Sequence, residues 1–295
     1  MCGNDNLDPR TLSFSQANGY EPLPQPLALG EISDQTRRKL WDLLYSSAWE
    51  WRYDWDGTGF NVAEPWTFFF EDMHTGYFER PLEEFGNNPN DLLAEYRAFI
   101  SESARFNKLF DLWQMIMRHP RCPRKFVKET ARIFEECRLA YVVDTSRPPT
   151  ILPAATPQEG TALVSAMKQS RESRQFGAET HLREAATRIN AGEWAESVRE
   201  SIHAVESVAR KLDPKHANTL DSALKSLEKQ VRIHPALRDA FGKLYGYTSD
   251  EDGVRHSLLE SSASPVGRDE AAFMLGACAS FVTYLLSKSR ADANS

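Results

Sequence analysis

The stretch Trp194-Ala-Glu-Ser-Val-Arg-Glu-Ser-Ile-His-Ala-Val-Glu-Ser-Val-Ala-Arg-Lys-Leu212 decides the class of fold. Its apolar residues recur at intervals of four, four, three, four and three positions: Trp194, Val198, Ile202, Val205, Ala209 and Leu212. This spacing follows the turn of an α-helix and places the apolar side chains on one stripe. Because such a stripe must be buried against other elements, the stretch predicts one helix of a bundle.

The segments that follow this stretch repeat the helical pattern. Pro214 ends the first helix, and leucines at positions 220, 224 and 227 mark a second. A shorter third helix is expected from Pro235 to Leu244, and the last helix is apolar from Ala271 to Leu286. No run in this half has the two-residue period of a strand. We therefore predict an all-α fold of two helical domains, of which the C-terminal one is a helix bundle.

The N-terminal half is also expected to be helical. Ser33 or Asp34 is suited to cap a first helix, and Pro65 is expected to start another. A further helical stretch runs from about Asn90 to Arg118, with a break near Asn107, and the next helix is expected to continue to about Tyr141.

A proline-rich segment divides the two halves. Pro148, Pro149, Pro153 and Pro157 fall within one short stretch, where backbone restriction disfavours continuous helix. The sequence before it is rich in aromatic residues, and the sequence after it is rich in Ala, Ser and Glu. We predict an N-terminal domain at residues 1–146, a linker at 147–157 and a C-terminal domain at 158–295.

Composition limits the classes of function. The chain has 295 residues and a net charge of −7, which excludes a generally basic nucleic-acid-binding coat but not a local basic patch. Five of the seven tryptophans fall between Trp41 and Trp66. Because few basic residues lie among them, they are interpreted as a core in preference to a base-stacking surface. The four scattered cysteines indicate reduced thiols.

The apolar run from Ala271 to Leu286 tests the possibility of a membrane span. It falls short of the ~20 residues that a span requires and contains Ser280, Thr283 and Tyr284. We interpret it as a core or dimer helix and expect no membrane contact. The first residues show no basic region followed by an apolar run, so we expect no signal peptide and a cytoplasmic protein.

Motifs for metal or nucleotide chemistry are missing from the sequence. There is no glycine-rich phosphate loop, no His-Glu-x-x-His and no nucleophile elbow. The seven histidines are dispersed, so we predict no metal site and no cofactor.

The adjacent residues Arg255 and His256 are the candidate catalytic pair. They follow an acidic turn and Gly253, which lets the backbone approach another group closely. A histidine can transfer a proton near neutral pH, and an arginine can hold a phosphate as charge develops on it. The alternative is an ordinary surface arginine and histidine, since adjacent residues of a helix point about 100° apart.

The strongest local basic cluster lies between Arg118 and Arg138. Arg124, Lys125 and Lys128 are its candidate substrate-binding residues, through contacts with phosphates. Glutamates at positions 129, 135 and 136 interrupt the cluster, so a solvated helix face is the alternative.

Two parts of the sequence resemble known families. The opening Phe-Ser-x-x-Asn-Gly-Tyr from Phe14, with alternating prolines and Arg-Arg-Lys-Leu-Trp ending at Trp41, resembles an N-terminal domain of the bacterial AbiJ abortive-infection family. Trp194 to Ser207 and Leu244 to Leu258 resemble a HEPN domain (higher eukaryotes and prokaryotes nucleotide-binding). The resemblance implies a phage-defence protein whose C-terminal half is a metal-independent RNase, usually a dimer with a composite site.

The resemblance also assigns roles to residues. HEPN RNases typically separate an arginine from a following histidine by four to six intervening residues, whereas here Arg255 and His256 are adjacent and carry over as the equivalents. The pairs Arg174 with His181 and Arg210 with His216 fit the usual spacing and are interpreted as chance.

The preceding helix is expected to contribute to the same site. Its polar residues Ser201 and Glu206 are expected to line the groove that binds substrate.

These observations predict an endoribonuclease of an abortive-infection system that acts on cellular or phage RNA. The alternatives are a catalytically inactive HEPN-like module that binds nucleotide, RNA or a partner protein of the defence system, and a purely structural helical dimer. A homodimer is expected through the last helix, whose apolar residues cover more than one face: Phe273, Met274, Leu275, Phe281, Val282, Leu285 and Leu286.

Overall fold

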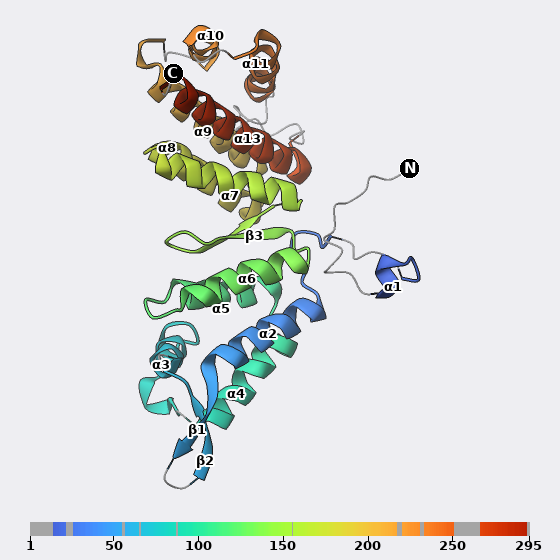
Figure 1. The fold of residues 1–295 in the computed structure, drawn as a ribbon, viewed down its shortest axis with the longest axis vertical. Helices are drawn as coiled ribbons and strands as arrows, with labels where there is room; N and C mark the ends of the chain where they lie inside the picture. Colours follow the sequence, from blue (N-terminus) through green and yellow to red (C-terminus); the bar gives the residue numbers. More distant parts are fainter. Residues whose placement is uncertain are drawn as a thin grey trace, which may run out of the picture. The chain divides into compact units, whose positions relative to one another are not determined.

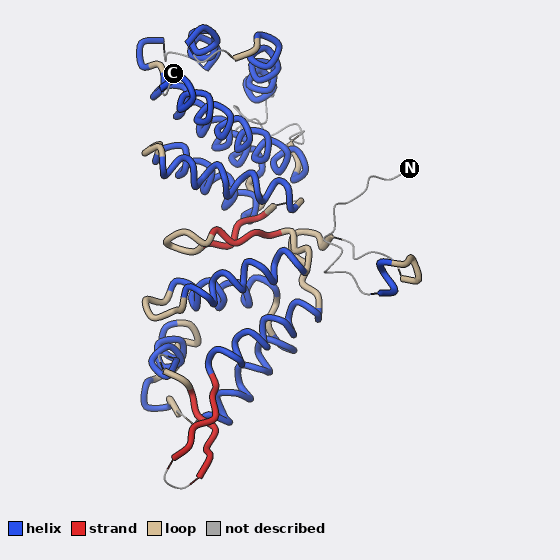
Figure 2. Tube along the Cα trace, in the orientation of Figure 1, coloured by secondary structure: helices blue, strands red, loops and turns tan. Residues whose placement is uncertain are grey.

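A computed structural model of the protein describes residues 14–21, 26–54, 57–64, 66–86, 88–154, 156–216, 220–230, 233–250 and 266–293. Helices dominate these residues, and two short hairpins are the strands among them (Figures 1 and 2). The prediction of an all-α fold is confirmed. The chain folds into two compact units, Met1–Ile151 and Leu152–Ser295.

Among the described residues, the first unit contains helices, the β1–β2 hairpin and strand β3. Its helices are α1 (Phe14–Ala17), α2 (Asp34–Ala48), α3 (Trp66–Gly76), the 3-10 helix η2 (Leu82–Glu84), α4 (Pro89–Ala98), the π-helix η3 (Phe99–Ser103), α5 (Phe106–Arg118) and α6 (Arg124–Glu136). Its strands are β1 (Trp49–Asp54), β2 (Gly57–Val62) and β3 (Tyr141–Asp144), and β4 (Thr150–Pro153) runs across the division between the two units. Strands β1 and β2 are antiparallel, with Trp49 opposite Val62, and β3 pairs with β4.

Local sequence explains where these helices begin and break. The Ser33 hydroxyl accepts the Thr36 N–H at 3.1 Å and caps α2, as one of the two expected capping residues. The break expected near Asn107 lies at Ala104 and Arg105, between η3 and α5. Helix α6 ends at Glu136, before the expected Tyr141, because the chain turns through a positive φ at Arg138 and continues into β3.

The core of the first unit is aromatic. Trp49 and Trp66 are buried, and their rings lie 5.1 Å and 6.3 Å from that of Phe70. Trp66 also contacts the ring of Phe126 on α6 at 5.3 Å. The prediction of a core is therefore confirmed for these two tryptophans, while the side chains of Trp51 and Trp55 lie outside the described part of the chain.

The proline-rich segment is more than a linker. The division between the units falls at residues 151 and 152, inside the stretch 147–157. Strand β4 occupies Thr150–Pro153, and Pro157 is the first residue of α7. The predicted linker at 147–157 therefore contains a strand, which pairs with β3 as a hairpin.

In its described residues, the second unit is a helix bundle with two further helices. Its elements are α7 (Pro157–Glu172), α8 (Phe176–Ala191), α9 (Trp194–Leu212), the 3-10 helix η4 (Pro214–His216), α10 (Leu220–Gln230), α11 (Pro235–Asp250) and α13 (Arg268–Ala293). Helices α7, α8, α9 and α13 pack against one another (Figure 1). Val198, Ile202, Val205 and Ala209 of α9 are buried, so the middle of the predicted stripe faces the core, whereas Trp194 at its start is 39% exposed.

Helix α13 is a central helix of this bundle. By length and composition alone Arg268–Arg290 could cross a membrane, and 50% of its apolar window is buried inside the fold. Of the seven apolar residues expected to require a second copy of the chain, only Phe273 is exposed, at 57%. The other six are buried, α13 packs against α7, α8 and α9, and the ring of Phe281 stacks on that of Phe241 of α11. The premise that a partner must cover a second apolar face is therefore wrong, because the same unit covers it.

Candidate functional site

The predicted catalytic pair cannot be placed in the fold. Arg255 and His256 lie outside the described residues, in the interval between the end of α11 at Asp250 and Val266. Their proposed chemistry therefore remains a prediction from the sequence.

The structure describes both residues of α9 that were expected to line the groove. Ser201 is fully buried, and its hydroxyl donates to the backbone carbonyl of Ser197 at 2.8 Å. Its hydrogen-bonding group is thus used inside the helix, so Ser201 does not line an open groove. The Glu206 side chain is 13% exposed and pairs with Arg210 one turn later, at 3.2 Å. The carboxylate of Glu206 therefore forms an ion pair within its own helix.

The three basic residues of α6 do not share one surface. Arg124 and Lys128, one helical turn apart, line a pocket of about 410 Å³. Lys125 lines a separate hollow, together with the acidic residues Glu129 and Glu136. Arg124 and Lys128 therefore share one pocket, whereas Lys125 lies in a surface of mixed charge, and phosphate contact by these residues stays a prediction.

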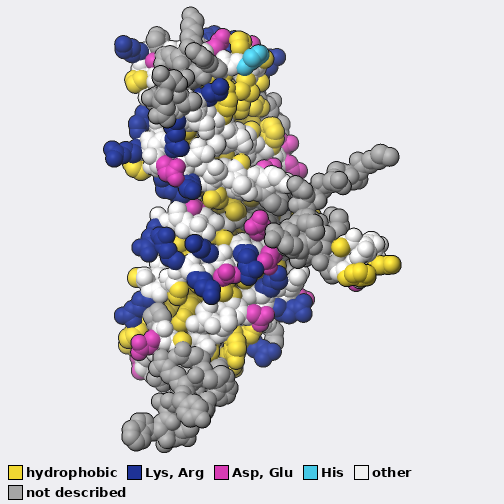
Figure 3. Space-filling model, in the orientation of Figure 1, with side chains coloured by type: hydrophobic (Ala, Val, Ile, Leu, Met, Phe, Trp, Pro, Cys, Tyr) yellow, Lys and Arg dark blue, Asp and Glu magenta, His cyan; other side chains and the backbone are white. Residues whose placement is uncertain are grey.

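The pocket is formed by the turn between α5 and α6 and by the β3–β4 loop. The residues that line it are Met117, Arg118, His119, Pro120, Cys122, Arg124, Val127, Lys128, Thr145, Arg147, Pro148 and Pro149. Four of these twelve are arginine or lysine, and none is acidic. In the space-filling view, Lys and Arg side chains gather over α5 and α6 (Figure 3).

One of the four cations holds the pocket together. The Arg118 guanidinium donates through Nε to the carbonyl of Pro149 at 2.9 Å and through Nη2 to the Thr150 hydroxyl at 3.2 Å. The backbone N–H of Ile151 donates to the side chain of Gln114 at 2.9 Å. These contacts attach the β3–β4 loop to α5 and thereby position Arg147 opposite α6.

The other three cations have free hydrogen-bonding capacity. Arg124, Lys128 and Arg147 are exposed, and none pairs with a carboxylate among the described residues. Arg124 is also the first residue of α6, whose N-cap Pro123 supplies no side-chain cap. The N–H groups of a helix start and three cations favour an anion at this position.

His119 lines the pocket but is not a free base. Its Nδ1 accepts the backbone N–H of Arg121 at 3.3 Å, so the hydrogen lies on Nε2. That Nε2 donates to the carboxylate of Asp72 at 2.9 Å, and the His119 side chain is 9% exposed. Both ring nitrogens are engaged, so the pocket can hold an anion but does not supply an available proton-transfer group through this residue.

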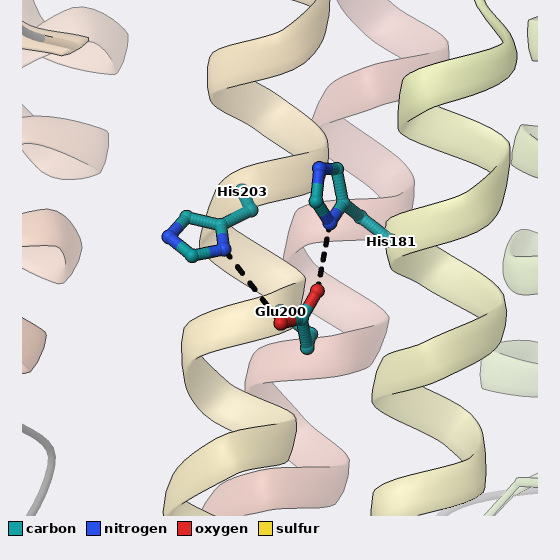
Figure 4. A group of neighbouring side chains, drawn as sticks. All are labelled: His181, Glu200 and His203. Atoms are coloured by element: carbon teal, nitrogen blue, oxygen red, sulfur yellow. Dashed lines mark hydrogen bonds and ion pairs between the residues drawn. The ribbon is translucent and has the colours of Figure 1, made fainter.

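A second group of functional side chains lies between α8 and α9. His181 of α8 donates from Nδ1 to Glu200 of α9 at 2.7 Å, because a carboxylate can only accept (Figure 4). Nδ1 of His203 lies 3.8 Å from the other oxygen of the same carboxylate. One nitrogen of each ring and one carboxylate oxygen all lie within 4.8 Å of one another. Histidine and carboxylate are ligands for divalent metals.

Sequence reasoning missed this cluster. The expectation that the histidines are too dispersed to gather is wrong for His181 and His203, whose ring centroids lie 5.3 Å apart. Glu200 and His203 form a Glu-x-x-His pattern on a predicted helix, which places both on one face. The partner on α8 could be found only from the pairing of the two helices.

Comparisons with known proteins found no relative. No protein-family model, curated protein or solved structure matches the chain. The resemblance to the AbiJ and HEPN families therefore rests on the sequence stretches quoted above, and the chemistry of the pocket and the cluster rests on their own geometry.

Proposed function

We propose that the protein is an RNA-binding effector of an abortive-infection system, in which the basic pocket of the first unit holds phosphates of an RNA chain. The observation that carries the proposal is the set of exposed cations around the pocket. Arg124, Lys128 and Arg147 surround about 410 Å³ and pair with no carboxylate among the described residues. The stretches that resemble AbiJ and HEPN proteins supply the biological setting.

Electrostatics favours a polyanion at this place. The whole chain carries a net charge of −7, so non-specific attraction of RNA to the protein is weak. A pocket with three free cations and no lining carboxylate has a locally positive electrostatic potential, opposite in sign to the net charge of the chain. If each cation neutralises one phosphate of a single strand, the logarithm of the binding constant falls with the logarithm of salt concentration at a slope of about −2.

Cleavage is assigned to Arg255 and His256. In the proposed reaction His256 removes the proton of a ribose 2′-hydroxyl, which attacks the adjacent phosphorus. The 5′-oxygen leaves and takes a proton, and a 2′,3′-cyclic phosphate remains. Arg255 holds the phosphoryl oxygens as their charge increases. The 2′-hydroxyl is the nucleophile, so the reaction is proposed to need no metal.

The second candidate function is a catalytically inactive module that binds RNA, nucleotide or a partner protein of the defence system. The adjacency of Arg255 and His256 favours it, because HEPN RNases usually separate the two residues. The same pocket serves both candidates. They differ only in whether bound RNA is cut.

Binding to a fluorescent single-stranded RNA tests the pocket. At 50 mM salt each neutralised phosphate contributes about eightfold to affinity, so Arg124→Glu with Lys128→Glu should weaken binding by more than about tenfold. Lys125→Glu is the matched control for Lys128→Glu alone, since each single substitution makes the same charge change on the same helix and only Lys128 lines the pocket. Equal losses in the pocket variant and the control would contradict the proposed site.

Cleavage of bulk RNA in the presence of EDTA separates the two candidates. The wild-type protein should cut RNA, and His256→Ala and Arg255→Ala should each reduce the rate by about 10²-fold or more. Full activity of a folded His256→Ala variant would exclude the assigned role. Binding without cleavage by the wild type would favour the inactive module.

The remaining parts of the proposal concern the oligomeric state and the cellular location of the protein. A cytoplasmic homodimer that brings two Arg255–His256 pairs to one cleft would compensate for their adjacency. Light scattering tests this directly, because one chain has a mass of 33.5 kDa. A monomer that cleaves RNA would exclude a composite site.

A further inference from the structure

The geometry points to a divalent transition-metal site formed by His181, Glu200 and His203, with zinc as the expected ion. This site is independent of the proposed RNA cleavage, which uses other residues and no metal. It lies entirely within the second unit, between two helices of the bundle (Figure 4).

The hairpin of α8 and α9 brings the three side chains together. Gly192, with φ of 76°, ends α8 in the left-handed conformation and turns the chain into α9. His181 lies eleven residues before Gly192, and His203 lies eleven residues after it. Residues equidistant from the turn of an antiparallel helix pair lie at the same height, so the two imidazoles face each other. Glu200 lies one turn from His203 on the same face.

The arginines near Glu200 pair with other glutamates, which leaves the Glu200 carboxylate able to bind a cation. Three other glutamates of these helices pair with arginines: Glu179 with Arg171 and Arg183, Glu196 with Arg199, and Glu206 with Arg210. Glu200 pairs only with the two imidazoles among the described residues. An acceptor held between two imidazoles, without a competing guanidinium, is suited to bind a cation.

The distances require only a small rearrangement. Zinc bonds of about 2.0–2.1 Å in a tetrahedral site separate the ligand atoms by about 3.3 Å. In the structure the three atoms lie within 4.8 Å of one another, and the His181–Glu200 contact is 2.7 Å. For an ion to bind, the hydrogen on Nδ1 of His181 moves to Nε2 through solvent, and Nδ1 becomes a ligand. No net proton is released from a neutral imidazole.

Ligand type and exposure define the kind of site. Two imidazoles and one carboxylate favour zinc, cobalt or nickel over magnesium and calcium, which prefer oxygen ligands. The side chains of His181 and His203 are 34% and 40% exposed, so an ion can enter from solvent. Three protein ligands leave a fourth position for water or another small ligand, which distinguishes the site from a closed structural one.

Titration of full-length protein, stripped with EDTA and dialysed, provides the test. Isothermal titration with Zn²⁺ should give one ion per chain, and Co²⁺ should give the visible absorption of a tetrahedral nitrogen–oxygen site. His181→Ala, Glu200→Gln and His203→Ala should each weaken binding by about 10-fold or more, as expected when one of three ligands is removed. At a hundredfold excess of Zn²⁺ over Kd, the thermal midpoint of the wild type should rise by about 5–10 °C.

His234→Ala is the matched control. His234 is an exposed imidazole of the same unit whose Nδ1 accepts the backbone N–H of Ala236. Its loss should leave the affinity and the single site unchanged. Circular dichroism of the metal-free variants separates loss of a ligand from loss of fold. Absence of Zn²⁺ binding by the wild type, or unchanged binding by folded His203→Ala protein, would overturn the proposal and leave a hydrogen-bonded helix contact.

Discussion

The hydrogen bond between Trp113 and Thr130 provides a quantitative test of the α5–α6 pair that carries the basic pocket. Both residues are fully buried, and the Trp113 Nε1–H donates to the Thr130 hydroxyl at 3.0 Å. The hydroxyl in turn donates to the carbonyl of Phe126 at 3.0 Å. The change Thr130→Val keeps the shape of the side chain and removes the acceptor. The indole N–H then remains buried without a partner.

The loss of stability expected from Thr130→Val follows from the burial of the Trp113 indole N–H. A buried donor left unsatisfied costs about 1–3 kcal/mol, because no water reaches it in the folded state. The carbonyl of Phe126 loses only a second donor, since helical carbonyls already accept a backbone N–H. We expect a loss of about 2 kcal/mol in the free energy of unfolding. For a unit of this size, that corresponds to a fall of about 4–8 °C in the thermal midpoint.

A double-mutant cycle measured by urea denaturation and calorimetry isolates the bond. Trp113→Phe removes the donor, so Thr130→Val should cost little in that background. The expected coupling between the two positions is about 1–2 kcal/mol. Equal costs of Thr130→Val in both backgrounds, within about 0.5 kcal/mol, would refute the bond. Affinity for RNA well below the midpoint should stay unchanged, because neither residue lines the pocket.

Three further outcomes are expected. Ser33→Ala should lower the stability of the first unit by about 1 kcal/mol in urea denaturation, whereas Ser33→Asp should retain most of it, because either oxygen can accept the Thr36 N–H. Gly192→Ala should cost about 1 kcal/mol through its φ of 76° alone, since no atom lies within 4 Å of the added Cβ, and Gly192→Asn should cost less in the same thermal assay. Burial raises the pKa of the Cys278 thiol from 9.0 to about 12, so the folded state keeps this proton at pH values where the unfolded chain loses it. Stability should therefore fall as pH rises from about 9 towards 12, with a smaller slope in Cys278→Ala, and the native thiol should react slowly with a disulfide reagent at pH 8.

Local pattern determined most of the helices. The stripe from Val198 to Ala209, the cap at Ser33, the helix end before Pro214 and the helix start at Pro235 were predicted from the sequence, because helix period and capping are short-range properties. The β3–β4 hairpin was not predicted from the sequence. Its strands are four residues long, and one of them lies in a stretch whose prolines indicate a linker.

Tertiary structure decided the rest. Sequence proximity grouped Lys125 with Arg124 and Lys128, but the helix turns Lys125 towards another surface, and the β3–β4 loop brings Arg147 to the pocket instead. His181 and His203 are 22 positions apart and meet only because α8 and α9 pack antiparallel. A helix pattern fixes which side chains share a face, whereas the partner of that face depends on how the helices pack, and this is a property of the whole core.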